Sequence, residues 1–152
     1  MKLEDAISNP KFNSEVHKST INILYTAHWL KTKLSNNLKE IDLTPEQYNI
    51  MRILKGKHPV KMCVKDLSSR MIEKSSNVPR ILDRLERKGL VERNQSPEDK
   101  RETETILTKK GILQLQIANE KTKENENKLM NLDEETAMKL NTILESIRNM
   151  EE

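Results

Sequence analysis

Residues 96–111 read SPEDKRETETILTKKG, and this stretch decides how the middle of the chain folds. Its serine-proline pair favours a turn, and residues 103–108 alternate between two faces in the manner of a half-buried strand. The stretch therefore predicts the tip and the second strand of a β-hairpin. Lys100 and Arg101 lie at that tip, so the hairpin either carries cations that only face water or presents them to an anion.

The length and composition of the chain set the frame for this hairpin. A chain of 152 residues predicts one domain that can bury a core of its own. Hydrophobic residues and charged residues each make up 34% of it, and elongated helices that bury one stripe each have such a composition. We therefore expect part of the core to lie between subunits.

Residues 1–13 show no signal-peptide pattern, and no apolar run approaches the 18 residues of a membrane span. These features predict a cytoplasmic protein with no membrane segment. The one cysteine, Cys63, fits a reducing compartment and excludes an intrachain disulfide and a cysteine-cluster metal site. Cys63 is either a redox switch beside Lys61 and Lys65 or a buried inert thiol, which is the more common case.

Charge is segregated along the chain. Residues 47–111 hold 16 basic against 9 acidic residues, whereas residues 1–46 hold 6 against 6 and residues 112–152 hold 5 against 9. The basic block is either a solvated surface or a surface for nucleic acid. The four aromatic residues are too few for recognition of RNA or single strands by base stacking. If the target is nucleic acid, we expect duplex DNA.

Helical signals surround the basic block. Apolar residues recur at helical spacing over residues 16–41 and predict one long amphipathic helix. A second helix is expected to begin after Thr44, where Pro45 and Gln47 complete a capping box, and to end at Gly56.

A short strand over residues 60–63 and a short helix over residues 64–71 lead to a fourth helix. We expect one of Ser75 and Ser76 to cap that helix, and the other to reach the DNA backbone. Lys88 and the glycine after it mark the end of the helix.

The outward face of the fourth helix is basic. Asn77, Arg80, Arg84 and Arg87 lie at i, i+3, i+7 and i+10 and form one polar ridge. Arginine is the side chain best suited to guanine edges and phosphates. The alternative is that Arg84 and Arg87 form ion pairs with neighbouring carboxylates on a solvated face.

The middle of the chain thus reads helix, short helix, turn, exposed basic helix, strand over residues 90–93, charged loop, strand over residues 103–108. This order is that of a winged helix-turn-helix, in which the hairpin is the wing. The major groove admits one α-helix, and the narrow, electronegative minor groove suits an arginine on a thin hairpin.

The wing resembles that of the MarR (multiple antibiotic resistance regulator) family of bacterial transcription factors. The family pattern is met with the same spacing at Asp99, Arg101, Leu107, Thr108 and Gly111. The resemblance implies a mainly α fold with a small β-hairpin, and a homodimer that binds a pseudo-palindromic operator. It places the recognition helix on residues 75–84 and the minor-groove arginine on Arg101. Pro79 stands where similar proteins often carry a hydroxyl, which puts that DNA contact in doubt.

The same resemblance implies the domain organisation. Residues 1–152 form a single MarR-like domain, with the winged helix-turn-helix over residues 44–111 and helical dimerisation regions over residues 1–42 and 112–152. The residues themselves agree with this, because an apolar stripe resumes after residue 129 behind a helix cap at Asp133. A helix at the end of a polar spacer needs the first helix or a second chain to cover its stripe.

Contacts with DNA are expected from side chains of the recognition helix, the turn before it and the wing tip. Asp99 cannot face phosphate favourably, so it is expected to brace the wing by pairing with a nearby arginine or by capping the turn. The expected contacts are Ser75, Ser76, Asn77, Arg80, Arg84, Lys100 and Arg101, with Lys65, Arg70 and Lys74 on phosphates.

Four aromatic or imidazole side chains leave two interpretations open. Tyr25, His28, Trp29 and Tyr48 either belong to the ordinary core or line a crevice in which similar proteins bind a small aromatic or phenolic effector.

No sequence feature predicts catalysis. The three histidines lack metal-ligand spacing, and no glycine-rich phosphate loop is present, so we expect no enzyme, no metal and no cofactor. The predicted function is that of a sequence-specific, double-stranded DNA-binding repressor. The alternative is a winged-helix module that binds another protein without specific DNA binding.

Overall fold

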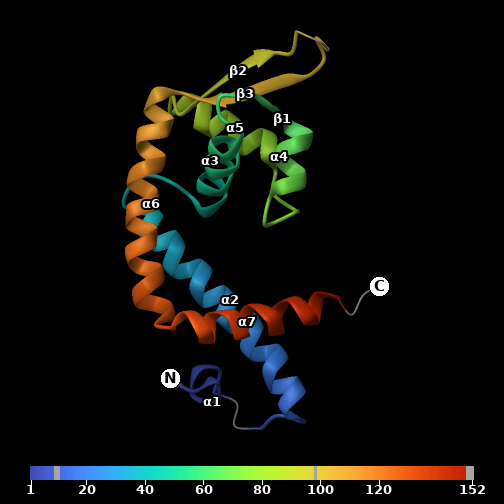
Figure 1. Cartoon of the computed structure of the whole chain (residues 1–152), viewed down its shortest axis with the longest axis vertical. Coiled ribbons are helices and arrows are strands. Elements are labelled where there is room, and N and C mark those ends of the chain that lie inside the picture. Colours follow the sequence, from blue (N-terminus) through green and yellow to red (C-terminus); the bar gives the residue numbers. More distant parts are fainter. Residues whose placement is uncertain (9–10, 98, 150–152) are drawn as a thin grey trace. The chain divides into compact units, whose positions relative to one another are not determined.

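The computed structural model describes residues 1–8, 11–97 and 99–149, without the side chains of residues 125–127. The chain is mostly helical with a small antiparallel sheet (Figure 1). It divides into two compact units, residues 1–118 and residues 119–152. The elements are α1 (Leu3–Ala6), α2 (Glu15–Lys39), α3 (Pro45–Lys57), β1 (Met62–Cys63), α4 (Val64–Arg70), α5 (Val78–Arg87), β2 (Val91–Gln95), β3 (Thr103–Leu107), α6 (Lys109–Met130) and α7 (Glu134–Arg148).

Helix α2 confirms the long amphipathic helix, and α3 confirms the capping box. Thr44 Oγ1 accepts the backbone N–H of Gln47, and Gln47 Oε1 accepts the backbone N–H of Thr44, both at 3.2 Å. The prediction that α3 ends at Gly56 is wrong, because the helix continues to Lys57. A glycine costs a helix only about 1 kcal/mol, whereas Pro59 disfavours the helical conformation for His58 and stops the helix there.

Helix α5 begins one residue later than the sequence suggested. Its N-cap is Asn77, whose Oδ1 accepts the backbone N–H of Arg80 at 3.1 Å. The prediction that Ser75 or Ser76 caps this helix is therefore wrong. Pro79 has no N–H to offer in the first turn, so Arg80 presents the donor that a cap must satisfy, and the asparagine reaches it.

The inward side of α5 builds the core of the winged helix-turn-helix. Val78, Leu82 and Leu85 are buried there, and Ile81 is partly buried. They belong to one cluster with Ile50, Met51 and Leu54 of α3. Because this packing fills the inner stripe of α5, the opposite side of the helix remains in solvent.

The predicted hairpin is part of a three-stranded antiparallel sheet. The strand order is β1-β3-β2, with Arg93 opposite Thr105 and Met62 also opposite Thr105 on the other side. The hairpin of β2 and β3 extends beyond the helices of this unit (Figure 1). It therefore has the form of a wing beside α5.

The Leu-Thr-x-x-Gly part of the wing pattern closes the base of the wing. Thr108 Oγ1 donates to the carbonyl of Gly89 at 2.7 Å and accepts the N–H of Gly111 at 2.9 Å. A Cβ at Gly111 would lie 2.0 Å from the carbonyl oxygen of Leu90. The motif thus holds the start of α6 against the end of the recognition helix, and only glycine fits at position 111.

The helices outside the winged unit expose apolar side chains. In α7, the described helix from Glu134 to Arg148 has no buried residue, and Ile143 is 57% exposed. Val16 and Leu24 of α2 and Leu113 of α6 are likewise exposed. No helix of the described residues has the length and hydrophobicity to cross a membrane.

Candidate nucleic-acid interface

The recognition helix presents two unpaired arginines. Arg80 and Arg84 are exposed on α5 and make no side-chain hydrogen bond or ion pair with any described residue. Arg87 differs, because its Nε donates to the backbone carbonyl of Asp83 at 3.2 Å. The ridge predicted from the sequence is present, and the guanidinium groups of Arg80 and Arg84 are free to bind an external acceptor.

Arg93 of β2 binds the acids of the recognition helix. Its Nη2 lies 2.6 Å from a carboxylate oxygen of Glu86 and 2.7 Å from one of Asp83, the two acids of α5. The hydrogen bond to Glu86, with that to Asp83, raises the pKa of Arg93. The sequence did not indicate this role of Arg93, which pairs with Asp83, an acid at i+3 from Arg80, and with Glu86. The available signal was the position of Arg93 in β2, the strand that directly follows α5.

A polar pocket lies beside the N-terminus of α5. It has a volume of about 270 Å³, and its lining residues are Glu46, Glu73, Ser75, Ser76, Asn77, Arg80, Ile81 and Arg84. Ser75 is exposed, whereas the hydroxyl of Ser76 is buried and has no hydrogen-bond partner among the described atoms. The structure thus brings together five of the predicted contact residues.

Two carboxylates of this pocket were not predicted, and a lysine of α2 partly neutralises them. Lys31 Nζ lies 2.5 Å from Glu73 and 3.6 Å from Glu46. The hydrogen bond to Glu73 raises the pKa of Lys31, with a smaller contribution from Glu46. This cluster connects α2, α3 and the turn that leads into α5. It also lowers the negative charge beside the basic ridge.

The wing tip exposes the side chain of Arg101, whose backbone is fixed by Asp99. Asp99 Oδ1 accepts the backbone N–H of Arg101 at 2.9 Å and lies 3.3 Å from its Nε. The Arg101 side chain is 91% exposed, so most of the guanidinium remains open to a partner. Lys100 beside it is exposed too.

The three predicted phosphate contacts lie on or next to α4. Lys65 and Arg70 are exposed and have no side-chain partner among the described residues. Lys74 Nζ donates to the backbone carbonyl of Ser69, so this ammonium satisfies the last turn of α4. Lys74 is therefore less available to a phosphate than the other two.

The four candidate effector residues have different surroundings. Tyr48 is buried in the hydrophobic core. The guanidinium carbon of Arg52 lies over its ring, 5.7 Å from the ring centroid. Tyr25 and Trp29 are partly exposed and His28 is exposed, all on α2. None of the four lines the pocket beside α5.

Cys63, in β1, is a free and partly exposed thiol. Among the described residues, no group of three or more histidine, cysteine, aspartate or glutamate side chains is placed to hold a metal ion.

Sequence comparison relates this geometry to a known family. Residues 43–103 match the MarR family. The chain is 36% identical over 73 residues to the HTH-type transcriptional regulator YkoM of Bacillus subtilis, which covers 48% of the chain and 46% of that protein. It is 30% identical over 111 residues to the HTH-type transcriptional repressor IacR of Pseudomonas putida, which covers 72% of the chain and 65% of that protein. The chain therefore spans about half to two thirds of the lengths of these relatives.

Solved structures share the fold. A MarR-like transcription regulator from Bacillus cereus superimposes with a TM-score of 0.81 at 22% identity, over 91% of this chain and 99% of that one. The organohalide-sensing regulator RdhR-CbdbA1625 in its 2,4-dichlorophenol-bound form gives 0.80 at 22% identity, over 91% and 82%. The MepR–DNA complex of S. aureus gives 0.77 at 23% identity, over 86% and 96%.

These similarities agree with the free arginines of α5 and with the wing, because each points to the same winged helix-turn-helix. Residues 43–103 thus match the MarR family, and the described chain shares the fold of a MarR-like transcription regulator.

Proposed function

We propose that the protein is a transcriptional regulator that binds double-stranded DNA in a sequence-specific manner and represses transcription as a homodimer. The observation that carries the proposal is the pair of unpaired arginines on α5 beside a wing that exposes Arg101. Two similarities support it: IacR is named a transcriptional repressor, and MepR is seen in complex with DNA.

The contacts follow from the chemistry of each element. Arg80 and Arg84 enter the major groove, where arginine forms two hydrogen bonds with guanine. Arg101 enters the flanking minor groove. Phosphate contacts come from Ser75, Lys65, Arg70, Lys74 and Lys100, and they position the protein without reading sequence. The hydroxyl of Ser76 is buried, so Ser76 is not among them.

The second copy of the chain is proposed from the exposed apolar side chains. Residues 1–42 and 112–152 form the dimerisation layer, and residues 44–111 bind DNA. A dimer covers side chains such as Leu24, Leu113 and Ile143 that the single chain leaves in water. Two recognition helices then reach successive major grooves, about 34 to 36 Å apart, on a pseudo-palindromic site.

The effector is proposed to be a small aromatic or phenolic compound that binds near Tyr25, His28, Trp29 and Tyr48. The dichlorophenol-bound form of RdhR-CbdbA1625 supports the chemical class. The chain has a single tryptophan, so quenching of Trp29 fluorescence by 2,4-dichlorophenol tests this part of the proposal. Unchanged fluorescence and unchanged DNA binding at saturating phenol would contradict it.

Selection of bound fragments from a pool of random duplexes tests the main proposal. We expect a symmetric consensus whose affinity falls steeply as salt rises, because several phosphates are neutralised. A protein-interaction module would select no consensus. Its binding to a protein partner through an apolar interface core would depend only weakly on salt.

A further inference from the structure

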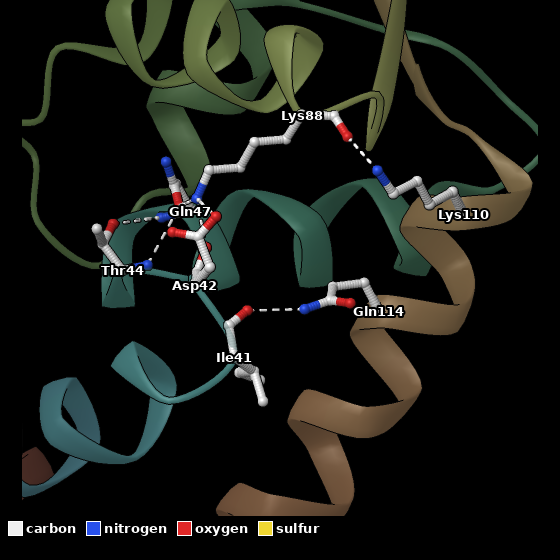
Figure 2. A network of polar contacts seen from close by, with 7 residues as sticks. All are labelled: Ile41, Asp42, Thr44, Gln47, Lys88, Lys110 and Gln114. Atoms are coloured by element: carbon white, nitrogen blue, oxygen red, sulfur yellow. Dashed lines mark hydrogen bonds and ion pairs between the residues drawn. The ribbon is translucent and has the colours of Figure 1, made fainter.

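Lys88, the C-cap residue of the recognition helix α5, reaches into the junction between α2 and α3 (Figure 2). Its Nζ donates to the backbone carbonyl of Asp42, lies 3.0 Å from the Asp42 carboxylate and lies 3.4 Å from Gln47 Oε1. An ammonium has three N–H donors, so these acceptors match its capacity. The Lys88 side chain is only 27% exposed.

The acceptors of Lys88 belong to a well-defined turn. Asp42 has φ of 54°, a left-handed conformation that aspartate and asparagine tolerate better than most residues. Gln47 is 3% exposed, and the oxygen that faces Lys88 also closes the capping box of α3. Lys88 therefore binds the point where the chain leaves α2 and starts the DNA-binding unit.

Helix α6 completes the junction from the other side. Lys110 Nζ donates to the backbone carbonyl of Lys88 at 2.7 Å, and Gln114 Nε2 donates to the carbonyl of Ile41 at 2.8 Å. Figure 2 shows these contacts as a chain that runs from the end of α2 to α5 and on to α6. The C-terminal end of the recognition helix is thus connected to both helices that leave the winged unit.

We propose that Lys88 is a positioning residue that sets the direction of the recognition helix relative to α2 and α6, and thereby the half-site spacing that the dimer accepts. The inference rests on the proposed function. Both recognition helices must seat at once on a palindromic site, so a small rotation of each helix weakens binding to the full site. Lys88 acts without touching DNA, because its ammonium is occupied by Asp42 and Gln47.

The test uses the full-length chain and the consensus duplex obtained by selection. Lys88→Met keeps the apolar stem of the side chain and removes the ammonium. Asp42→Asn removes the carboxylate and keeps both the carbonyl acceptor and a residue suited to positive φ. Lys109→Met is the matched control, since it removes one charge from an exposed lysine of α6 with no side-chain partner among the described residues.

Affinity is measured for the consensus, for duplexes with one base pair added to or removed from the spacer, and as a function of salt. We expect Lys88→Met to lose about tenfold or more on the consensus, to lose the preference for the native spacer, and to keep the parent slope of log K against log salt. Asp42→Asn is expected to shift both affinity and spacer preference in the same direction by a smaller factor. Lys109→Met should keep the spacer preference.

Two results would overturn the inference while the proposed function stands. One is a Lys88→Met protein with the parent affinity and spacer preference. The other is a salt slope reduced by about one with the spacer preference intact, which is the behaviour of a phosphate contact. A parent protein that binds no duplex would remove both the function and the inference. Amide hydrogen exchange in the free protein gives a separate readout, since loss of the Lys88 contacts should accelerate exchange at residues 43–48.

Discussion

The charge around Arg80 and Arg84 depends on a third arginine. Arg93 holds Asp83 and Glu86, so the two acids of α5 do not neutralise the ridge. An arginine occupied by a neighbouring carboxylate would have to lose that partner before it could bind a base. At the scale of single residues, an ion-pair cluster outside the expected contact surface therefore lowers the negative charge near the ridge.

Replacement of Arg80 by alanine should relax base preference and cost about 1 to 3 kcal/mol of binding free energy, because a bidentate base contact is lost. Affinities for the selected consensus and for single-base variants of it measure this effect. Lys57→Ala is the control, since it removes one exposed positive charge from α3. An Arg80→Ala protein that discriminates bases as well as the parent would contradict the assignment.

Replacement of Arg101 by alanine should weaken binding with less change in major-groove base preference, because a minor-groove arginine reads mainly groove width and potential. The same set of duplexes, extended by changes in the flanking base pairs, separates the two arginines. Equal binding of the Arg101→Ala protein and the parent at every salt concentration would remove the wing from the interface.

At the scale of elements, the ion pairs of Arg93 connect the wing with the recognition helix. Arg93→Met should lower DNA affinity although Arg93 itself reads no base, because it leaves two carboxylates of α5 unpaired near the proposed contact surface. Isothermal titration with the consensus duplex measures the loss. In an Arg93→Met background, Glu86→Gln should recover part of the lost DNA affinity. The absence of any recovery would argue against an electrostatic cause.

The base of the wing has a steric requirement at Gly111. Gly111→Ala should lower the free energy of unfolding by about 1 to 3 kcal/mol, because the new methyl group meets the Leu90 carbonyl. Gly56→Ala is the matched control, with no heavy atom within 4 Å of the new Cβ. It should stabilise α3 by roughly 0.5 to 1 kcal/mol. Urea unfolding of the two variants measures these free energies. A Gly111→Ala protein as stable as the parent would be inconsistent with this geometry.

At the scale of the whole molecule, the proposed dimer rests on the exposed apolar side chains of α2, α6 and α7. We expect Ile143→Glu to shift the protein from dimer to monomer and to abolish high-affinity binding to the palindrome, since a carboxylate is costly to bury. Sedimentation velocity measures the assembly. Thr142→Glu, an exposed change on the polar side of the same helix, should leave the dimer intact. A parent protein that sediments as a monomer at all concentrations would refute the dimer.

How far the fold could be predicted depends on the distance between the interacting residues. The capping box of Thr44 and Gln47 and the outward polar ridge of α5 were predicted correctly, because a helix repeats within a few residues. The cap of α5 was wrong although it is local. Ser75, Ser76 and Asn77 are all good caps, and backbone geometry chose among them.

The sequence predicted the positively charged residues of the candidate site, but not the carboxylates beside them. Periodicity placed Arg80 and Arg84 on one outward face, but it could not show that Arg93 occupies the acids beside them, since that pairing requires the strand to fold back along the helix. Lys31 and the carboxylates Glu46 and Glu73 meet for a similar reason, because their three elements come together only in the packed unit.

By itself, the sequence determined the order of helices and strands, the basic ridge of the recognition helix and the arginine at the wing tip, because each depends on spacing along the chain. Only the tertiary structure decided which of these cations are free and which are engaged. Lys88 and Asp42 lie 46 residues apart and meet because α3 and α5 share one hydrophobic core. The partner of a charge is set by that packing, and no periodicity in the sequence records it.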